Sequence, residues 1–342
     1  MKTILVTGGA GFIGSNFIRR LCSQYEDYKI FVLDALTYAG RVANIPEEFI
    51  ASERVEFWHG NVMHSDIVDA LVSRSDVIIH FAAETHVTRS IYSNRQFFDT
   101  DVIGTHVVSN SVLKHRATVE RFIHVSTSEV YGTSTTPLMN EDHPLNPSSP
   151  YASAKCGADR LVYSYWNTYQ LPAVIIRPFN NFGPFQHLEK VIPRFITSCI
   201  MNEPMTVHGD GDAERDWLYV EDHCDALDRA LHVPIESIAG QAINIGTGKA
   251  TSILDIARIV AKEMGFGAEK IRFIADRPGQ VVRHACDSAR ARNLLGWEPA
   301  TSLLTGIRKT IDWYRNHPDW WSGQLSLRKI PIILADGKKV FH

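Results

Sequence analysis

Cysteine pairs, long apolar runs and clusters of like charge are all lacking in this sequence of 342 residues, and each absence excludes a class of protein. The few cysteines are scattered without a CxxC pair, which argues against a disulfide framework and a zinc site, so we expect no metal. Apolar runs are too short to span a bilayer, so we expect no membrane partner. A net charge of −3 without a basic block argues against nucleic acid.

Targeting signals, repeats and low-complexity tracts are also absent from the sequence. Met1 and Lys2 lead directly into an apolar run, so we expect no signal peptide and a cytoplasmic protein. The remaining composition is ordinary for a globular enzyme, with 44% hydrophobic and 21% charged residues. This length and composition predict one or two domains with a sizeable core.

Short Val/Ile/Phe-rich runs alternate with helical periodicity through the first half of the chain. Such buried runs, separated by helices, predict an α/β fold with a Rossmann-type doubly wound parallel sheet covered on both faces. A ligand then lies at the carboxyl ends of the strands. The predicted strands are Thr3–Thr7, Ile30–Leu33, Val55–Trp58, Val77–Phe81, Phe122–Ser126 and Val174–Arg177.

The pattern changes after Arg177, where Pro, Gly, Asn and His become frequent. The run 242–246 is predicted to return to the sheet as a strand, and Ser252 is predicted to cap a helix that stops near Gly265. We therefore expect the sheet domain in residues 1–176, with return segments near 220–250. A smaller, interleaved lobe is expected mainly in residues 177–320, followed by a C-terminal tail in 321–342.

Three glycines near the N-terminus predict a dinucleotide site. The motif is Gly8-Gly9-Ala10-Gly11-Phe12-Ile13-Gly14. Gly8 permits a tight turn, Gly11 lets a phosphate approach the backbone, and Gly14 lets the helix pack closely on the strand. The next helix would present free N–H groups and its positive end to the pyrophosphate. Asp34 ends the next strand, 20 residues after Gly14, where a carboxylate can bind the ribose 2′-hydroxyl. This pattern predicts NAD rather than NADP.

A tyrosine and a lysine follow at helical spacing. Pro150 opens a predicted helix, which puts Tyr151 and Lys155 on one face. An ammonium group beside a phenol is expected to lower the pKa of the phenol, so that Tyr151 can take a proton from an alcohol as hydride leaves. Thr127, at the end of a preceding strand, can hydrogen-bond the same alcohol oxygen.

Glu129 adds a function that a simple alcohol dehydrogenase does not need. Once an alcohol becomes a ketone, the adjacent C–H is acidified, and a carboxylate can remove that proton. A hydroxyl one carbon further on can then leave as water. The residues therefore predict oxidation of a sugar-like alcohol with an added proton-transfer step.

Several longer motifs resemble the extended short-chain dehydrogenase/reductases. Within that family the chain is most similar to the nucleotide-sugar 4,6-dehydratases, above all the dTDP-glucose 4,6-dehydratases, from Met1 to about Tyr314. The motifs beyond the glycine turn are Leu36-Thr37-Tyr38-Ala39-Gly40, Ala82-Ala83-Glu84-Thr85-His86-Val87, Arg89-Ser90, Asn180-Asn181-Phe182-Gly183-Pro184, Glu189-Lys190 with Ile192-Pro193, Arg215-Asp216-Trp217-Leu218-Tyr219-Val220-Glu221-Asp222-His223, and Asp276-Arg277-Pro278-Gly279.

This resemblance implies roles for individual residues. It implies NAD contacts, in residues 1–176, at Gly8, Gly11, Phe12, Ile13, Gly14, Asp34, Thr37, Ala39, Asn61, Val62, Ala82, Ala83, Tyr151 and Lys155. It implies catalytic positions at Thr127, Ser128, Glu129, Tyr151 and Lys155. It implies nucleotide-sugar contacts, mainly in residues 177–320, at Glu84, His86, Asn180, Lys190, Arg215 and Arg283. Arg and Lys suit diphosphate oxygens, although structural salt bridges are the alternative for Arg215 and Arg283.

The catalytic triplet departs from the pattern of the dTDP-glucose enzymes. They have Thr-Asp-Glu, with Asp as general acid, whereas this chain has Thr127-Ser128-Glu129. A serine hydroxyl is a far weaker acid, so Ser128, a bound water or protonated Glu129 must assist the leaving hydroxyl. The triplet resembles GDP-mannose 4,6-dehydratases and related amino-sugar enzymes, and also UDP-glucuronate decarboxylases. Asn61 and Asp101 stand where the family usually has Asp and Asn.

A 4,6-dehydratase acting on a hexose nucleotide is the leading functional expectation. A UDP-glucuronate decarboxylase or a C4-epimerase is the alternative, and an NAD-binding regulatory protein without activity is a third. The resemblance also implies a homodimer, formed by four helices from about 95–115 and 151–169. The apolar stripe Phe97, Phe98, Val102, Val107 and Val108 could serve that interface or face its own sheet. The base and the sugar are left open.

Overall fold

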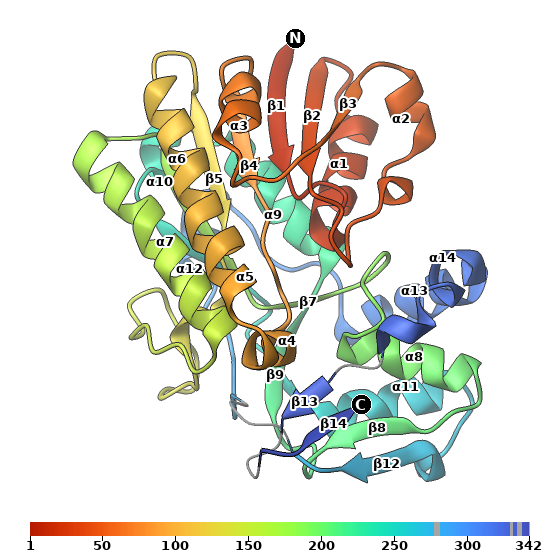
Figure 1. The fold of residues 1–342 in the computed structure, drawn as a ribbon. Helices are drawn as coiled ribbons and strands as arrows, with labels where there is room; N and C mark the ends of the chain where they lie inside the picture. Colours follow the sequence, from red (N-terminus) through yellow and green to blue (C-terminus); the bar gives the residue numbers. More distant parts are fainter. Residues whose placement is uncertain (277–280, 329–330, 334–336, 342) are drawn as a thin grey trace.

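A seven-stranded parallel sheet is the centre of the computed structural model, which describes residues 1–276, 281–328, 331–333 and 337–341 (Figure 1). Every neighbouring pair of strands is parallel, and the central order is that of a dinucleotide-binding doubly wound sheet, so the predicted fold class is confirmed. In spatial order the strands are β3 (Val55–His59), β2 (Tyr28–Asp34), β1 (Lys2–Thr7), β4 (Val77–His80), β5 (Arg121–Val125), β6 (Ala173–Pro178) and β10 (Ala242–Ile245).

Apolar side chains on both faces of these strands explain why the sheet is buried. Side chains alternate along a strand, so Ile4 and Val6 face one core while Leu5 between them faces the other. β10 pairs with β6 from Ala242 to Ile245, which confirms that this run returns to the sheet.

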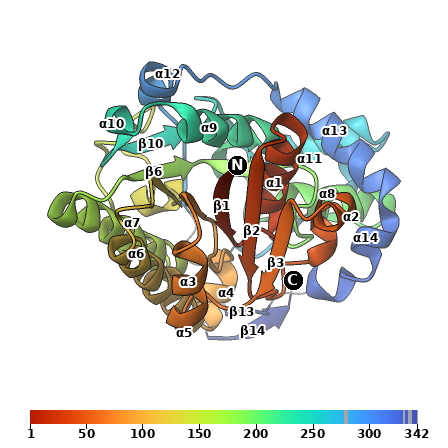
Figure 2. The same ribbon diagram turned by 90° about the horizontal axis from the view of Figure 1, so that it is seen from above.

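Helices cover each face of the sheet, as the view from above shows (Figure 2). One face packs against α1 (Phe12–Gln24), α9 (Val220–His232), α10 (Ile235–Ile238) and α12 (Ala289–Leu295). The other packs against α3 (Ser65–Val72), α6 (Thr105–Lys114) and α7 (Pro150–Tyr169). Short α2 (Glu47–Ala51) precedes β3, and α4 (Val87–Tyr92) follows β4.

The helix expected over residues 95–115 is not uniformly α-helical. It begins as α5 (Arg95–Phe97), widens into a π-helical segment over Phe98–Gly104 and continues as α6. The predicted apolar stripe divides accordingly. Phe97 and Val108 are buried in the chain's own cores, whereas Phe98 is 41% exposed.

A smaller lobe lies beyond the carboxyl ends of the sheet strands (Figure 1). β8 (Met205–His208) pairs with β12 (Ile271–Ile274), and β7 (Asn180–Phe182), β9 (Glu214–Tyr219) and β11 (Ala250–Ser252) form a second small sheet. Its core is shared with α8 (Val191–Ile200), α11 (Ile253–Glu263) and α13 (Leu303–Asn316). Ser252 caps α11 by accepting the Asp255 N–H at 3.0 Å, as predicted.

Short α14 (Pro318–Ser322) leads into the C-terminal tail, which contributes an antiparallel pair, β13 (Pro331–Ile333) and β14 (Lys339–Phe341). Trp320 of α14 donates its indole N–H to Asn44 Oδ1 at 2.7 Å, so α14 contacts the loop after β2. Short 3-10 helices span Val42–Asn44, Ser128–Tyr131, Ala268–Lys270 and Leu325–Arg328. In the described part of the chain, no helix has both the length and the apolar character needed to cross a membrane.

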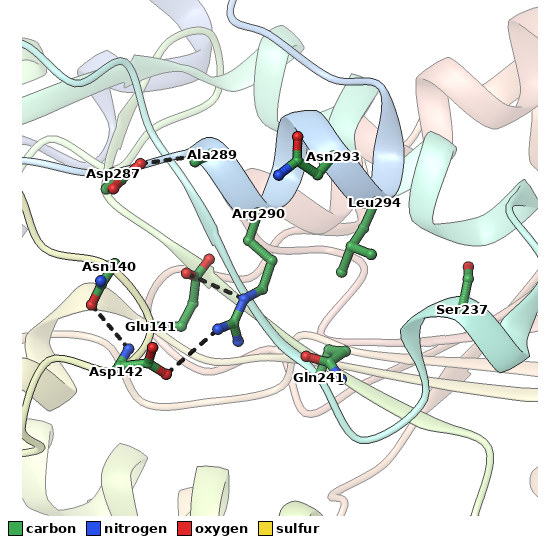
Figure 3. Close-up of a pocket in the computed structure, with 10 residues that line it drawn as sticks. All are labelled: Asn140, Glu141, Asp142, Ser237, Gln241, Asp287, Ala289, Arg290, Asn293 and Leu294. Atoms are coloured by element: carbon green, nitrogen blue, oxygen red, sulfur yellow. Dashed lines mark hydrogen bonds and ion pairs between the residues drawn. The ribbon is translucent and has the colours of Figure 1, made fainter.

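The outer edge of β10 is covered by side chains. Glu141 accepts the Asn244 N–H at 2.8 Å, and Arg290 donates to the Ala242 carbonyl at 3.1 Å. Figure 3 shows Arg290 reaching toward Glu141 and Asp142 across a surface cleft of about 410 Å³. These contacts occupy two of the backbone polar groups that an unpaired edge strand would offer to another chain. The cleft is separate from the predicted catalytic residues.

Candidate active site

The predicted site residues converge at the carboxyl edge of the large sheet. Most of them lie at the ends of β1, β2, β3, β4, β5 and β6 or in the loops that follow, and on the first two turns of α7. Lys190, Arg215 and Arg283 lie on the small-lobe side. In a doubly wound sheet this edge is where a ligand binds. The sequence prediction therefore places its residues on one side of the molecule, facing the small lobe (Figure 1).

The glycine turn has the geometry that a dinucleotide requires. Gly8 has φ +71°, and a Cβ there would lie 2.6 Å from the Ala82 nitrogen. A Cβ on Gly14 would lie 2.5 Å from the Gly8 carbonyl oxygen, so this glycine allows α1 to pack on the turn. At Gly11 only that same carbonyl is close, at 3.2 Å. Phe12 and Ile13 open α1, where the first N–H groups have no partner within the helix.

Asp34 joins the glycine turn to the loop after β2. Its carboxylate accepts the Ala10 N–H at 2.9 Å and the Leu36 N–H at 2.8 Å. Burial raises the pKa of Asp34, and these two hydrogen bonds oppose that shift. Thr37 and Ala39 follow in a loop closed by the Gly40 N–H on the Thr37 carbonyl at 3.1 Å.

Two further predicted cofactor contacts lie after β3. Asn61 Oδ1 accepts the Met63 N–H at 2.9 Å, which fixes the amide side chain in a turn. Val62 is buried and packs against Gly104, where an added Cβ would lie 2.6 Å from a Val62 methyl carbon. Ala82 and Ala83 follow β4 and are partly buried near the glycine turn.

Tyr151 and Lys155 are both buried on the same face of α7, as predicted. Ser149 caps this helix by accepting the Ala152 N–H at 3.1 Å, and Pro150 occupies its first position. The Tyr151 ring packs against Phe97 with 6.3 Å between ring centroids. The Thr127 side chain lies within hydrogen-bonding reach of the Tyr151 phenol.

The charge relation between Tyr151 and Lys155 differs from the prediction. Lys155 donates its ammonium to the Val125 carbonyl at 2.9 Å, behind the site. The pKa of Tyr151 is raised, first by burial and then by the charge of Asp101, while the Thr127 hydrogen bond lowers it. The expected lowering of this pKa by Lys155 is therefore wrong for the protein alone, because burial outweighs any effect of the ammonium.

Asp101 enters the site because of the π-helical segment. It is 1% exposed, and its Oδ1 accepts the Glu84 N–H at 2.8 Å. Its Oδ2 is buried and has no hydrogen-bond partner in the part of the chain that the structure describes. Burial raises the pKa of Asp101, while the charge of Lys155 lowers it. The sequence showed Asp101 as a departure from the family pattern, but periodicity alone gave no sign of the widened turn.

Asp101→Asn is expected to move the rising limb of the pH–rate profile toward lower pH. Burial raises the pKa of Asp101 to about 8, so the substitution removes a negative charge above that pH, and the phenolate of Tyr151 then forms at lower pH. The measurement is the rate of the alcohol oxidation predicted from the sequence, as a function of pH. The control is Asp99→Asn on the same turn, whose side chain is 40% exposed and pairs with Arg95. If the rising limb of the pH–rate profile stays at the same pH in Asp101→Asn, Asp101 does not affect the pKa of Tyr151.

The triplet Thr127-Ser128-Glu129 opens the 3-10 helix after β5. Thr127 caps it by accepting the Glu129 N–H at 3.2 Å. Ser128 is 2% exposed, and the Glu129 side chain is 16% exposed. His284 lies beside both, with its Nδ1 3.4 Å from Ser128 Oγ and 3.9 Å from Glu129 Oε1. Sequence analysis missed His284, which lies 156 residues from Ser128.

A buried carboxylate connects the cofactor loops with the small lobe. Glu189 has a fully buried side chain and accepts the Tyr38 hydroxyl at 2.7 Å and the Arg89 guanidinium at 3.1 Å. His86 Nε2 lies 3.6 Å from the same carboxylate. The nearby positive charges lower the pKa of Glu189 against the opposing effect of burial. Glu84 is buried in the same region, and burial raises its pKa.

Glu189 was quoted as part of a motif but was not predicted as a site residue. The sequence signal that could have identified Glu189 is its position next to Lys190. In the structure the Lys190 ammonium donates to the Thr85 carbonyl at 2.9 Å. One carboxylate thus holds residues from the loops after β2 and β4 against the segment before α8. This contact positions His86 and Lys190, the two predicted substrate residues in the group.

The remaining predicted substrate residues lie at the small-lobe side. Asn180 has its Oδ1 buried with no hydrogen-bond partner among the described residues, which is the condition of an amide that a ligand completes. Arg215 is buried and donates to the Glu214 carbonyl at 2.9 Å. Arg283 pairs with the Glu214 carboxylate at 2.7 Å and donates to the Pro137 carbonyl at 2.9 Å. The structural salt bridge considered for Arg283 is therefore present.

Metal ligands and reactive thiols were not expected at the site. In the ranges that the structure describes, no group of three or more His, Cys, Asp and Glu side chains is arranged to hold a metal ion. Cys156, next to Lys155, is partly buried, and burial raises its pKa. Of the quoted motif Asp276–Gly279, Arg277, Pro278 and Gly279 lie outside the described residues.

Comparisons with known proteins agree on one family. The family model described as GDP-mannose 4,6 dehydratase matches residues 5–310. The low-salt glycan biosynthesis protein Agl12 of Haloferax volcanii is 43% identical over 311 residues, which are 91% of this chain and 98% of that protein. The dTDP-glucose 4,6-dehydratase of Streptomyces niveus is 39% identical over 323 residues, 93% of this chain and 94% of that protein.

Solved structures give the same result. The dTDP-glucose 4,6-dehydratase DesIV of Streptomyces venezuelae, crystallised with NAD, is 37% identical and superposes with a TM-score of 0.89. The alignment covers 94% of this chain and 99% of that one.

Proposed function

The chain belongs to the GDP-mannose 4,6 dehydratase family, and from this premise we propose which residues perform its reaction and on what class of sugar. The leading expectation from the sequence is confirmed: the chain is an NAD-dependent nucleotide-sugar 4,6-dehydratase, which is a hydro-lyase. The substrate we propose is a hexose nucleotide of the dTDP-glucose type, and the product is its 4-keto-6-deoxy form. The observation that carries the proposal is the grouping of Thr127, Glu129 and Tyr151 beside the glycine turn.

NAD fits the residues at the sheet edge. We propose that the α1 N-terminus and Gly11 hold the pyrophosphate, because the N–H groups are free and no side chain blocks the approach. Asp34 would bind the adenosine ribose with the lone pairs that its two backbone hydrogen bonds leave over. When bound, NAD would supply an acceptor for the hydride that leaves the substrate C4 and, once reduced, a donor of hydride to the substrate C6. Its positively charged nicotinamide ring would favour a neighbouring phenolate.

Tyr151 is proposed to take the proton of the C4 hydroxyl. Its phenol lies beside Thr127, which can hold the same substrate oxygen and so orient it toward the tyrosine. Lys155 fixes this arrangement from behind through the Val125 carbonyl. Because the pKa of Tyr151 is raised in the protein alone, proton transfer is favoured only once the site also holds positive charge.

Glu129 is proposed to take the C5 proton after C4 has become a ketone. The carboxylate is partly exposed, so a substrate can reach it, and the Thr127 cap holds its backbone in place. Loss of the C5 proton allows the C6 hydroxyl to depart as water once that oxygen receives a proton. Ser128 is the triplet residue that remains for this last transfer.

The diphosphate and sugar contacts are proposed from position and charge. Lys190 and Arg215 carry positive charge at the small-lobe side, and Asn180 offers an unpaired amide oxygen. Arg283 would join them only by sharing its guanidinium with Glu214. Glu84 and His86 lie after β4 and would face the hexose.

A homodimer in the cytoplasm is the assembly and location that we propose. Helices α6 and α7 lie side by side on one face of the sheet (Figure 2). Phe98, Ile103, Tyr163 and Tyr169 on or next to them are each more than one-third exposed. A second copy of the chain would cover these side chains, and sedimentation analysis tests the mass of the particle.

Mass spectrometry of products tests the function. The purified protein is incubated with dTDP-glucose, UDP-glucose, UDP-N-acetylglucosamine, GDP-mannose and UDP-glucuronate in parallel. Loss of one water from a hexose nucleotide is the expected result, and the reactive member names the substrate. Loss of carbon dioxide from UDP-glucuronate, or a product of unchanged mass with inverted C4, would overturn the proposed substrate class.

A further inference from the structure

A histidine from the C-terminal half closes the back of the catalytic triplet. His284 is fully buried, and its backbone N–H donates to the Glu214 carbonyl at 3.1 Å. The residues around it form bridges to two other segments, Arg283 with Glu214 and Cys286 with Met139. The imidazole is therefore held in one place by backbone contacts on both sides.

The hydrogen bonds of His284 fix which nitrogen carries the proton. Nε2 lies 2.7 Å from the Gly132 carbonyl oxygen, which can only accept, so Nε2 carries the hydrogen. In the neutral ring the lone pair is then on Nδ1. This nitrogen faces Ser128 Oγ at 3.4 Å and Glu129 Oε1 at 3.9 Å. Nδ1 is thus an acceptor placed between the two triplet side chains.

The charges around the ring set its protonation state. Burial lowers the pKa of His284 most, and the charges of Arg215 and His143 lower it further. The carboxylate of Glu129 and the Gly132 hydrogen bond act in the opposite direction. At neutral pH the ring is therefore neutral when Glu129 is ionised. When Glu129 gains a proton, Nδ1 is the base beside it.

We propose that His284 is a positioning residue that passes a proton from Glu129 to Ser128 while water is lost. This inference rests on the proposed function, because it concerns the elimination step of the dehydratase reaction. The Ser128 hydroxyl is a weak acid, so it needs a second group that returns a proton to it if it is to protonate the leaving oxygen. The relay supplies that group.

The step balances without any outside acid. The C5–H bond breaks, its proton goes to the Glu129 carboxylate, and its electron pair forms the C5=C6 double bond as the C6–O bond breaks. The departing oxygen takes the Ser128 hydroxyl proton. Ser128 regains a proton from His284 Nδ1, which receives one from Glu129. At the end both the triplet and the ring are as they began, and the C5 proton has left in the water.

The distances suit a relay that closes when substrate binds. Both gaps to Nδ1 exceed the usual 2.7–3.2 Å of a good hydrogen bond. Such contacts are often long in a free enzyme and shorten in the substrate complex. The Glu129 side chain is partly exposed and can turn, whereas the buried Ser128 and His284 cannot move far.

The direct test is His284→Gln. The Gln side-chain nitrogen can still donate to the Gly132 carbonyl, but no lone-pair nitrogen remains beside Ser128. We expect water loss to slow about 100-fold, in the range of a lost proton-transfer group. The rate of C4 oxidation, followed by the absorbance of reduced nicotinamide, and the KM for the sugar nucleotide stay within about twofold. Reduced cofactor and 4-keto sugar then accumulate.

A second substitution separates a proton relay from a structural role. Ser128→Asp introduced into His284→Gln provides a carboxylic acid at the triplet, which needs no histidine behind it. We expect this double variant to regain at least about 10-fold in water loss over His284→Gln. A structural role of His284 predicts no such rescue, and absence of rescue would overturn the relay.

Other outcomes are equally decisive. Water loss at the wild-type rate in His284→Gln overturns the relay, and so does an equal loss of C4 oxidation, which marks damage to the whole site. If His284→Gln does not fold, Ser128→Ala tests the same path: slow water loss with normal C4 oxidation supports it, and wild-type water loss overturns it. If the wild-type enzyme releases no water from any hexose nucleotide, the proposed function itself fails.

Discussion

Glu129→Gln retains oxidation at C4 and loses dehydration, with water release expected to fall by about 1,000-fold. The amide has nearly the same shape as the carboxylate and leaves the Thr127 cap intact, because that cap uses the Glu129 backbone N–H. It cannot accept the C5 proton. The expected result is accumulation of reduced nicotinamide and 4-keto sugar, measured by absorbance and by mass spectrometry of the quenched reaction.

Glu141→Gln is the matched control for this variant. Glu141 is also a mostly buried glutamate, 4% exposed at its side chain, but it lies at the outer edge of β10 and accepts the Asn244 N–H. A Gln oxygen can accept that same hydrogen bond, so we expect turnover close to that of the wild type. Water release by Glu129→Gln at a rate near the wild-type value would assign the C5 proton to another base.

Arg177→Leu is expected to lower the free energy of unfolding by about 3–5 kcal/mol. Arg177 of β6 is 2% exposed and binds the fully buried Asp159 of α7 through two hydrogen bonds of 2.8 Å. It also donates to the Tyr131 hydroxyl at 2.8 Å. Without the guanidinium, Asp159 is left as a buried charge, and its other ion pair is with Arg160, whose side chain is 41% exposed. Urea unfolding measures the loss.

The same pair makes stability depend on pH. Hydrogen bonds and charge from Arg177 hold the pKa of Asp159 well below its usual range, although burial acts against them. A lowered pKa in the folded state stabilises the fold above the unfolded value of about 3.9, and this contribution is lost as the pH falls further. Arg177→Leu should therefore flatten the acid limb of the stability curve.

Arg308→Leu serves as the control for the ion pair. Arg308 is 58% exposed and pairs with Glu263 at the surface, where solvent screens the charges, so its removal should leave the unfolding free energy close to that of the wild type. A loss of similar size in both variants would mean that the buried pair contributes no more than a surface pair. Arg177→Leu with Asp159→Leu should lose less than Arg177→Leu alone, since no charge is then left buried.

Most of the large sheet could be predicted from the sequence because its signals are local. Continuous Val, Ile and Phe runs give each strand to within two residues at either end, and Gly8, Gly11 and Gly14 give the turn between β1 and α1. The i, i+4 spacing of Tyr151 and Lys155 was enough to place both on one helix face. These features need only the geometry of one strand or one helix.

Features that depend on distant or irregular contacts could not be predicted. The π-helical segment that buries Asp101 has the composition of an ordinary helix. His284 reaches Ser128 because residues 283–286 fold back between β9 and the segment at Met139, with bridges from Arg283 to Glu214 and from Cys286 to Met139. The pKa of Tyr151 was predicted from one neighbour, whereas burial and Asp101 determine it. Periodicity carries no information on such tertiary contacts.

The covering of the sheet has a consequence for how the chain is made. Val6 and Val32, from the first two strands, pack in one core with α9, and Arg20 pairs with Asp228 of α9, 208 residues later. On the ribosome, the nascent first half therefore presents an uncovered apolar sheet face until α9 has emerged. Such a surface attracts chaperones and other nascent chains. The yield of active enzyme in a cell will depend on protection during that interval as well as on the stability of the finished fold.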